Sequence, residues 1–396
     1  MLSQAPWALP SASLISVTKI LVLYAGGTFG MRQRPSSPHS DQLRLLQGKP
    51  LTNVSLRELG ARLEREIGND LVALSGGGAN LQWEWRGIED QQGQPLRPLD
   101  SAALAPWHWQ AIFRGIRRNY NDYDGFVVIH GTDTLAYTAS ALSFLFEALD
   151  KPVVLTGSQL PIFEPRNDAR MNFIHALMVA GWKWSGLVKI PEVMIAFGER
   201  LLRGNRSRKV STTGWQGFDS PNFPWLGQLA ESVRIHQAYA EGPGFRFSVN
   251  SLVGYRCEEL PEEAGPLEDR VLDLTLFPGI RAAHLSALLL QQDLKGLLLR
   301  CYGSGNAPDD PLLLRELQKA QARGVQIVVV SQCNEATVDL GRYATSQGLA
   351  DCGAISGFDL PPAALKRLTA NPVLLTDQSG FALMDHVIDT FDGAHG

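Results

Sequence analysis

The chain of 396 residues is long enough for two domains, since one domain usually takes roughly 100–200 residues. Hydrophobic residues make up 44% of it and charged residues 19%, which is typical of a globular protein with a sizeable core. The net charge of −4 is small, so the composition argues against nucleic acid or an acidic membrane surface as a partner.

The first residues resemble neither a signal peptide nor an ordered element. Residues 1–18 contain Pro6, Pro10 and scattered serines, with no basic stretch ahead of an apolar one. We therefore predict a disordered tail there. No apolar run in the sequence approaches the length of about 18 residues that spans a bilayer, so no membrane association is expected.

The four cysteines predict free thiols. Cys257, Cys301, Cys333 and Cys352 form no CxxC pair, and no cluster of histidines accompanies them. A zinc site or a disulfide framework is therefore not expected. Free thiols indicate a reducing compartment, and we predict a cytoplasmic protein without a metal.

The first domain, predicted over residues 19–231, alternates short apolar runs with helical patterns. Lys19–Tyr24 is a buried strand that feeds the turn Ala25-Gly26-Gly27-Thr28. Three further strands are predicted at Gly125–His130, Val153–Leu155 and Val193–Ala196, and a helical pattern runs from Leu135 to Leu149. This alternation predicts an α/β fold, with a mostly parallel sheet covered by helices on both faces.

A change of rhythm marks the boundary of a second domain. Residues 232–269 contain Gly242-Pro243-Gly244 and an acidic stretch with prolines, and we interpret them as a linker. Strands are again predicted at Leu272–Leu276, Gly296–Arg300 and Val325–Ser331. Residues 270–396 are therefore predicted to form a second, smaller α/β domain.

Polar groups follow three of the strands in the first domain. They are Thr28, the pair Thr132-Asp133, and Ser158, and ligands of open parallel sheets bind beyond the carboxyl ends of strands. Asp133 taken alone is equally typical of a helix cap. A hydroxyl nucleophile needs a base or a cation beside it, and Lys209 is a candidate. The glycine-rich AGGTFG run fits neither common nucleotide-binding pattern.

The runs Ala25–Gly30 and His130–Thr134 resemble the two signatures of the bacterial-type L-asparaginases, GGTIG and HGTDT. The similarity is closest to the cytoplasmic type I branch. It continues through Lys151–Pro161, Arg203–Arg206 with Lys209, and Arg300–Pro308. It covers nearly all of the chain after Lys19, except residues from about Arg32 to Asp100.

The resemblance implies a role for each matching residue. Thr28 is the expected nucleophile, which forms an acyl-enzyme. Thr132, Asp133 and Lys209 are expected to activate the nucleophile or the hydrolytic water, and Asp133 also to hold the substrate's amino group. Ser101 is expected to hold the α-carboxylate. The substrate site is expected to be lined by Gly27, Gly131, Gly157 and Ser158. Backbone N–H groups near Gly27 and Thr132 are expected to stabilise the oxyanion. The resemblance further implies no cofactor and a homo-oligomer, a dimer or tetramer.

The sequence departs from the family pattern around the lid and the carboxylate pocket. The family has a lid tyrosine shortly after the first threonine, but this chain has none between Tyr24 and Tyr120, and His39 is the nearest replacement. After Ser101, a second serine and an acid of the family are replaced by alanines. Trp83 and Trp85 lie upstream, where they either contact a larger substrate or pack beneath the loop.

Three functions are compatible with these residues. The first is hydrolysis of the side-chain amide of L-asparagine. The second is the same chemistry on a modified, N-acylated or peptidyl asparagine-like amide in a biosynthetic pathway. The third is a non-catalytic asparagine sensor, which would predict loss of the signature threonines, acid or lysine, and all of these are present. Arg300 and Cys333 match an effector site of the type I branch, and we expect a structural role for both, with Cys333 as a small buried group.

Overall fold

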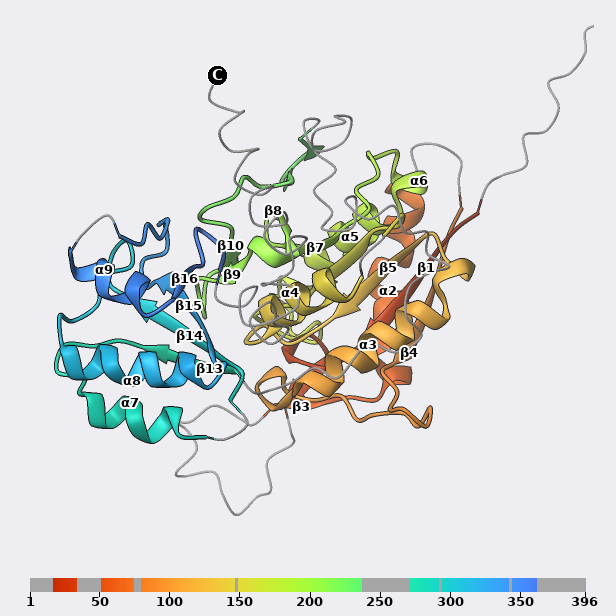
Figure 1. The fold of residues 1–396 in the computed structure, drawn as a ribbon. Helices are drawn as coiled ribbons and strands as arrows, with labels where there is room; N and C mark the ends of the chain where they lie inside the picture. The colour runs from red at the N-terminus through yellow and green to blue at the C-terminus, as the bar shows by residue number, and fades with distance from the viewer. Residues whose placement is uncertain are drawn as a thin grey trace, which may run out of the picture.

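The computed structural model describes residues 17–33, 51–74, 80–146, 149–236, 271–291, 294–341 and 344–361. Most of the predicted tail, residues 34–50 and most of the predicted linker therefore lie outside the described residues. Within them the chain forms two sheets with their own helices, and the smaller sheet lies to one side of the larger (Figure 1).

The larger sheet has the strand order β12-β11-β8-β7-β6-β5-β1-β4 in the described part of the chain. Its parallel strands are β1 (Val17–Tyr24), β4 (Asn80–Gly87), β5 (Gly125–Ile129), β6 (Val153–Thr156) and β7 (Val193–Phe197). Its antiparallel edge consists of β8 (Arg200–Arg203), β11 (Gly227–Leu229) and β12 (Val233–Ile235). The four predicted strands are confirmed, and β12 extends the sheet into the range predicted as a linker.

Helices cover both faces of this sheet, as predicted. On one face lie α2 (Leu56–Leu74), α5 (Ala169–Ala180) and α6 (Trp182–Ser185), and α2 buries a leucine or isoleucine every fourth residue from Leu59 to Leu71. On the other face lie α3 (Pro106–Arg118) and α4 (Leu135–Leu145). Neighbouring residues of β1 alternate between the two cores, because side chains of a strand point to opposite faces.

The strand order reverses direction beside β1. From β1 the chain moves to β4 on one side and then returns to β5 on the other side, so β1 and β5 are neighbours. A crevice opens beyond the carboxyl ends of two such strands, since their connections leave in opposite directions. The fold therefore favours a ligand site where Thr28 and Thr132 follow β1 and β5.

Two successive crossovers in the larger sheet have opposite hands. The steps from β5 to β6 and from β6 to β7 move the same way along the sheet, but α4 and α5 lie on opposite faces. One of them must be left-handed, which is rare among parallel strands. The arrangement places the start of α5 beneath the loop that follows β6.

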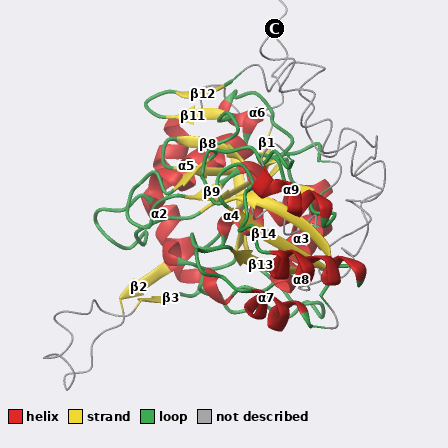
Figure 2. Ribbon diagram, turned by 60° about the vertical axis from the view of Figure 1, so that its left-hand side comes forward, coloured by secondary structure: helices red, strands yellow, loops and turns green. Residues whose placement is uncertain are grey.

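Two short antiparallel pairs flank the larger sheet. β2 (Met31–Gln33) pairs with β3 (Leu51–Asn53), and the two lie side by side at the periphery of the molecule in Figure 2. β9 (Arg208–Lys209) pairs with β10 (Phe218–Asp219). The first pair brackets the unmatched segment after Thr28, and the second carries Lys209.

The second domain is a parallel sheet of β13 (Val271–Thr275), β14 (Gly296–Cys301), β15 (Gln326–Ser331) and β16 (Ile355–Ser356). Its helices are α7 (Ala282–Leu289), α8 (Pro311–Ala322) and α9 (Ala344–Asp351), which share one apolar core with the sheet. α8 begins at Asp310, whose carboxylate accepts from the N–H of Leu312, with Pro311 in the first turn. The predicted smaller α/β fold is confirmed.

Candidate active site

The signature segments meet in direct backbone contact at the switch point. Gly26 and Gly27 have φ of +121° and +91°, a conformation that favours glycine. A Cβ built on Gly27 would lie 2.3 Å from the Cα of Gly131. A Cβ built on Gly131 would lie 2.6 Å from the Oγ of Ser101. The segments of Thr28, Thr132 and Ser101, far apart in sequence, therefore border one another.

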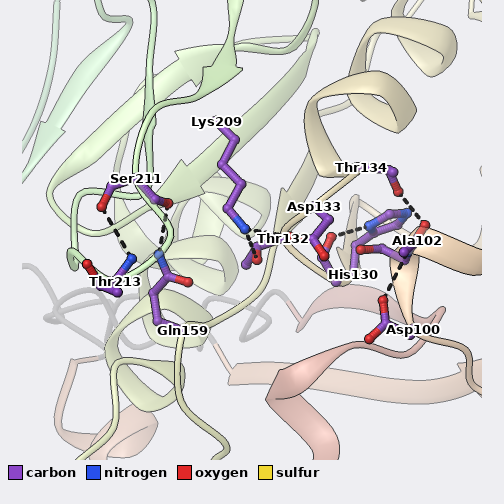
Figure 3. Close-up of polar contacts among 12 residues, drawn as sticks. Asp100, Ala102, His130, Thr132, Asp133, Thr134, Gln159, Lys209, Ser211 and Thr213 are labelled. Atoms are coloured by element: carbon purple, nitrogen blue, oxygen red, sulfur yellow. Dashed lines mark hydrogen bonds and ion pairs between the residues drawn. The ribbon is translucent and has the colours of Figure 1, made fainter.

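Lys209 joins the second signature from the opposite side. Its Nζ donates to the Oγ1 of Thr132 at 2.8 Å and to the Oδ1 of Asp133 at 2.7 Å (Figure 3). The side chain of Lys209 is 17% exposed, whereas that of Asp133 is 58% exposed. The ammonium thus links a buried hydroxyl to a carboxylate that faces solvent, an arrangement suited to proton transfer.

Thr28 and Ser101 occupy short 3-10 turns at the edge of the crevice. Thr28 opens η1 (Thr28–Gly30) directly after the glycine turn, and it is half-buried. Ser101 opens η2 (Ser101–Ala103), where the Asp100 carboxylate caps the N–H of Ala102 at 2.9 Å. Ser101 is buried, and its backbone oxygen accepts from the Thr134 hydroxyl at 2.8 Å.

His130 fixes the backbone of the second signature. It is fully buried, with Nδ1 at 2.7 Å from the Gly131 carbonyl and Nε2 at 2.8 Å from the Thr138 hydroxyl. Because a carbonyl only accepts, Nδ1 carries the proton and Nε2 accepts from Thr138. Burial lowers the pKa of His130 to about 4, so the ring stays neutral near pH 7. Both ring nitrogens are engaged by protein partners, so His130 is placed to hold the backbone beside Thr132.

The loop after β6 presents an unpaired hydroxyl. Ser158 is 1% exposed, and its Oγ has no hydrogen-bond partner within the described residues. A buried hydroxyl without a partner is costly, so a bound ligand is its natural partner. A Cβ built on Gly157 would lie 2.4 Å from the His130 carbonyl oxygen, which brings this loop against the second signature.

A carboxylate and an amide on α5 hold that loop. Asp168 accepts from the backbone N–H groups of Gln159 and Leu160 at 2.9 Å and 3.0 Å. Asn172 donates to the carbonyl of Gly157 at 2.9 Å. Burial raises the pKa of Asp168, although these N–H donors oppose the shift. Gln159 in turn donates to the carbonyls of Ser211 and Gly214, in the loop that follows Lys209, and Figure 3 shows its contact with Ser211.

The segments that carry Thr28, Ser101, Thr132 and Ser158 border one another at the carboxyl ends of β1, β5 and β6, and Lys209 contacts Thr132 and Asp133. The supporting side chains of His130, Asp168 and Asn172 were not predicted from the sequence. His130 belongs to the second signature, and this position is the only feature of the sequence that could have indicated its role. The others act through contacts with residues distant in sequence, which no local pattern reveals.

The regions that depart from the family pattern have three different outcomes. Trp83 and Trp85 lie in β4 and pack on Phe173 of α5, with ring centroids 5.2 Å and 5.3 Å away, so they pack as the second alternative expected, but against a helix rather than beneath a loop. Ala102 and Ala103 are exposed. His39 lies outside the described residues.

Arg300 and Cys333, the two residues that match the effector site of the type I branch, differ in their burial and contacts. Arg300 pairs with Asp273 through two hydrogen bonds of 2.7 Å and 2.6 Å, as a structural role predicts. Cys333 is exposed, so the prediction that it is a small buried group is wrong, because it lies beyond the end of β15 rather than within that strand. Cys301, Cys333 and Cys352 are free thiols as predicted, and Cys257 lies outside the described residues.

No three histidine, cysteine, aspartate or glutamate side chains cluster as a metal site in the described part of the chain. Among the helices described, none is long and apolar enough to cross a membrane.

Comparison with known proteins agrees with this geometry. The N-terminal asparaginase family model matches residues 19–241, and the glutaminase/asparaginase C-terminal domain model matches residues 270–371. L-asparaginase 1 of Escherichia coli K12 is 41% identical over 262 residues, which cover 66% of this chain and 72% of that protein. A human 60 kDa lysophospholipase is 36% identical over 354 residues, 89% of this chain but 57% of that protein.

Solved structures show the same fold. L-asparaginase I from Vibrio cholerae has a TM-score of 0.67 and 31% identity, over 90% of this chain and 94% of that one. The thermostable L-asparaginase from Thermococcus kodakarensis has a TM-score of 0.67 and 27% identity, over 93% and 95%. This chain therefore belongs to the asparaginase family. It is an enzyme of that type, an amidohydrolase.

Proposed function

We propose that the protein hydrolyses the side-chain amide of L-asparagine to aspartate and ammonia, with Thr28 as nucleophile and through an acyl-enzyme. The observation that carries the proposal is the position of the Lys209 ammonium, which donates to both Thr132 and Asp133 beside the Thr28 turn. The relatives named L-asparaginase support the substrate.

In the first half of the reaction, the Thr28 hydroxyl adds to the amide carbon and loses its proton to the Thr132–Lys209–Asp133 set. Backbone N–H groups near Gly27 and Thr132 stabilise the oxyanion that forms. The C–N bond then breaks, and the proton leaves with ammonia. The acyl group remains as an ester on Thr28.

In the second half, the same set removes a proton from water, which attacks the ester. Aspartate leaves, and the Thr28 hydroxyl regains its proton. The partly exposed Asp133 faces solvent and can also pair with the substrate's amino group. Ser101 and the unpaired Ser158 hydroxyl are the proposed contacts for the rest of the substrate, where Ser101 would hold the α-carboxylate.

A second candidate is the same chemistry on a modified, N-acylated or peptidyl asparagine. The exposed Ala102 and Ala103 beside Ser101 favour it, since neither offers a polar group to a free amino acid. A site that loses polar partners of a small charged substrate binds it less well, whereas an acylated substrate needs fewer of them.

We also propose that the enzyme works in the cytoplasm as a homo-oligomer. The three described cysteines are free thiols, which suits a reducing compartment. Large apolar side chains such as Trp107, Met171 and Trp215 are exposed, and these are suited to burial between subunits. Light scattering would measure the mass in solution; a monomeric mass would contradict the oligomer.

The test is ammonia release from purified protein supplied with L-asparagine. We expect Thr28→Ala and Lys209→Met each to lower kcat by about 1,000-fold or more. When residues act as one catalytic unit, removal of one of them costs nearly as much activity as removal of all. Thr28→Ser should retain part of the activity. Lys183→Met is the matched control, because Lys183 forms a lysine–aspartate pair of the same 2.7 Å length with Asp124, away from the crevice.

Full activity of Thr28→Ala would refute the nucleophile. No ammonia from asparagine, but Thr28-dependent release from an N-acylated asparagine, would favour the second candidate. A folded wild-type protein without turnover of either substrate would contradict both.

A further inference from the structure

Tyr24, the last residue of β1, carries a buried hydroxyl beneath the turn of Thr28. It is 1% exposed, and its hydroxyl donates to the Oδ1 of Asn53 at 2.7 Å. The same oxygen accepts a hydrogen bond from the backbone N–H of Gly30, which ends the Thr28 turn. Burial raises the pKa of Tyr24 above its usual range, so the hydroxyl keeps its proton near pH 7.

The turn is shaped around this hydroxyl. A Cβ built on Gly30 would lie 2.1 Å from the Tyr24 oxygen and 2.7 Å from its ring carbon. Only glycine therefore lets the turn approach the ring so closely. The position of the Thr28 turn relative to β1 is thus set by a polar contact and a tight packing contact at the same atom.

Asn53 extends the link to the segment of Ser101. It ends β3, and its Nδ2 donates to the carbonyl of Pro98 at 3.2 Å. The next residue, Leu99, accepts from the N–H of Gly27 at 3.0 Å, and Ser101 follows two positions later. One side-chain pair therefore connects the turn of the proposed nucleophile with the segment of the proposed carboxylate contact.

We propose that Tyr24 and Asn53 are positioning residues of the active site, which set the distance between Thr28 and Ser101. The inference rests on the proposed function, in which these two residues act on one substrate. Tyr24 holds the Thr28 turn, so its loss should act on the chemical step. Asn53 also holds the Ser101 segment, so its amide should act on substrate binding.

A small displacement is enough to matter. A misplacement of about 1 Å between reacting groups can lower a rate by about 100-fold. Removal of the Tyr24 hydroxyl also leaves the Gly30 N–H and the Asn53 oxygen without their partner, which favours a shift of the turn. The expected signature is a loss of kcat that exceeds what a loss of stability would cause.

The experiment compares Tyr24→Phe with Tyr120→Phe in the full chain, assayed with L-asparagine. Tyr120 is also 1% exposed, donates to the Asp150 carboxylate at 2.6 Å and accepts a backbone N–H at 2.9 Å. It lies directly before β5, at the amino ends of the parallel strands, whereas the proposed site lies at their carboxyl ends. We expect similar losses of Tm, but kcat lowered at least about tenfold in Tyr24→Phe alone.

A second variant, Asn53→Asp, keeps the acceptor for Tyr24 and replaces the donor to Pro98 by an oxygen. We expect it to raise KM several-fold with less effect on kcat. It decides the question if Tyr24→Phe does not fold.

Equal kcat in Tyr24→Phe and Tyr120→Phe, or an Asn53→Asp variant with unchanged KM, would overturn the inference while Thr28 dependence is retained. Lack of asparagine turnover by the wild type would instead overturn the proposed function, and this inference with it. That outcome is seen before any Tyr24 variant is compared.

Discussion

At the scale of single residues, His130 shows how burial sets a protonation state. The ring donates its proton to one carbonyl and accepts from the Thr138 hydroxyl, so a second proton would reverse the bond with Thr138 and place a charge in a fully buried site. Its pKa is lowered to about 4 by burial, whereas an unfolded histidine titrates near about 6.5. The unfolded chain therefore binds this proton first as the pH falls.

This difference predicts a pH-dependent stability. Stability from neutral His130 is fully present above pH about 6.5 and is lost as the pH falls towards about 4. Between pH about 7 and about 5 the free energy of unfolding should fall by about 2 kcal/mol through this residue. His130→Gln can keep both hydrogen bonds without titrating, so urea unfolding of that variant should show a shallower pH dependence. Parallel profiles for the two proteins would contradict the assignment.

The sequence identified the residues of the proposed site, but it did not identify the side chains that support them. Thr132, Asp133 and Lys209 belong to a pattern whose chemistry requires proximity, and the structure places them within hydrogen-bonding distance. Tyr24 and Asn53 carry no such pattern, because a tyrosine in an apolar strand is equally compatible with simple packing. Their role depends on which residues the fold brings next to them.

At the scale of elements, the strands were predicted most completely where apolar runs were uninterrupted. β5, β6 and β7 are buried on both faces, so nearly every residue had to be apolar. β4 is an edge strand in which exposed and partly buried residues alternate, and charged residues interrupt its pattern. In the sequence of β4, the feature typical of a strand is the pair of tryptophans two positions apart, Trp83 and Trp85.

The packing of those tryptophans explains why they do not reach the crevice. Trp83 and Trp85 share one face of β4 and pack on Phe173 of α5, and Phe29 makes an edge-to-face contact with the same ring. Phe29 follows Thr28 directly, so this aromatic cluster packs against the turn that carries Thr28. The two tryptophans therefore contribute to the core between β4 and α5.

At the scale of the whole molecule, a buried ion pair joins the two domains. Arg206, with a side chain 4% exposed, donates to Asp359 at 2.9 Å and 2.5 Å, and Asp359 lies beyond β16 of the second domain. Asn222 adds hydrogen bonds to the carbonyls of Asp359 and Ala336. Since Arg206 is three residues before Lys209, this contact lies close in sequence to a residue of the proposed site.

Removal of one charge should therefore weaken the domain contact. Asp359→Asn leaves the buried guanidinium without its carboxylate, and such a loss costs about 3–5 kcal/mol. We expect a clear fall in Tm by calorimetry, or separation of one unfolding transition into two. Glu58→Gln removes the solvent-exposed pair with Arg32 and should leave the Tm nearly unchanged. Equal Tm values for the two variants would show that Asp359 is not structurally important.

The sequence by itself determined the α/β class, the positions of the buried strands along the chain and the residues proposed for the site. These depend on local apolar periodicity and on motifs whose residues are close along the chain. Only the tertiary structure decided that Gly27 and Gly131 pass in contact, that Tyr24 and Asn53 join the Thr28 and Ser101 segments, and that Trp83 and Trp85 pack away from the site. The physical reason is that such contacts join residues far apart in sequence, and their energies depend on burial, which only the folded chain creates.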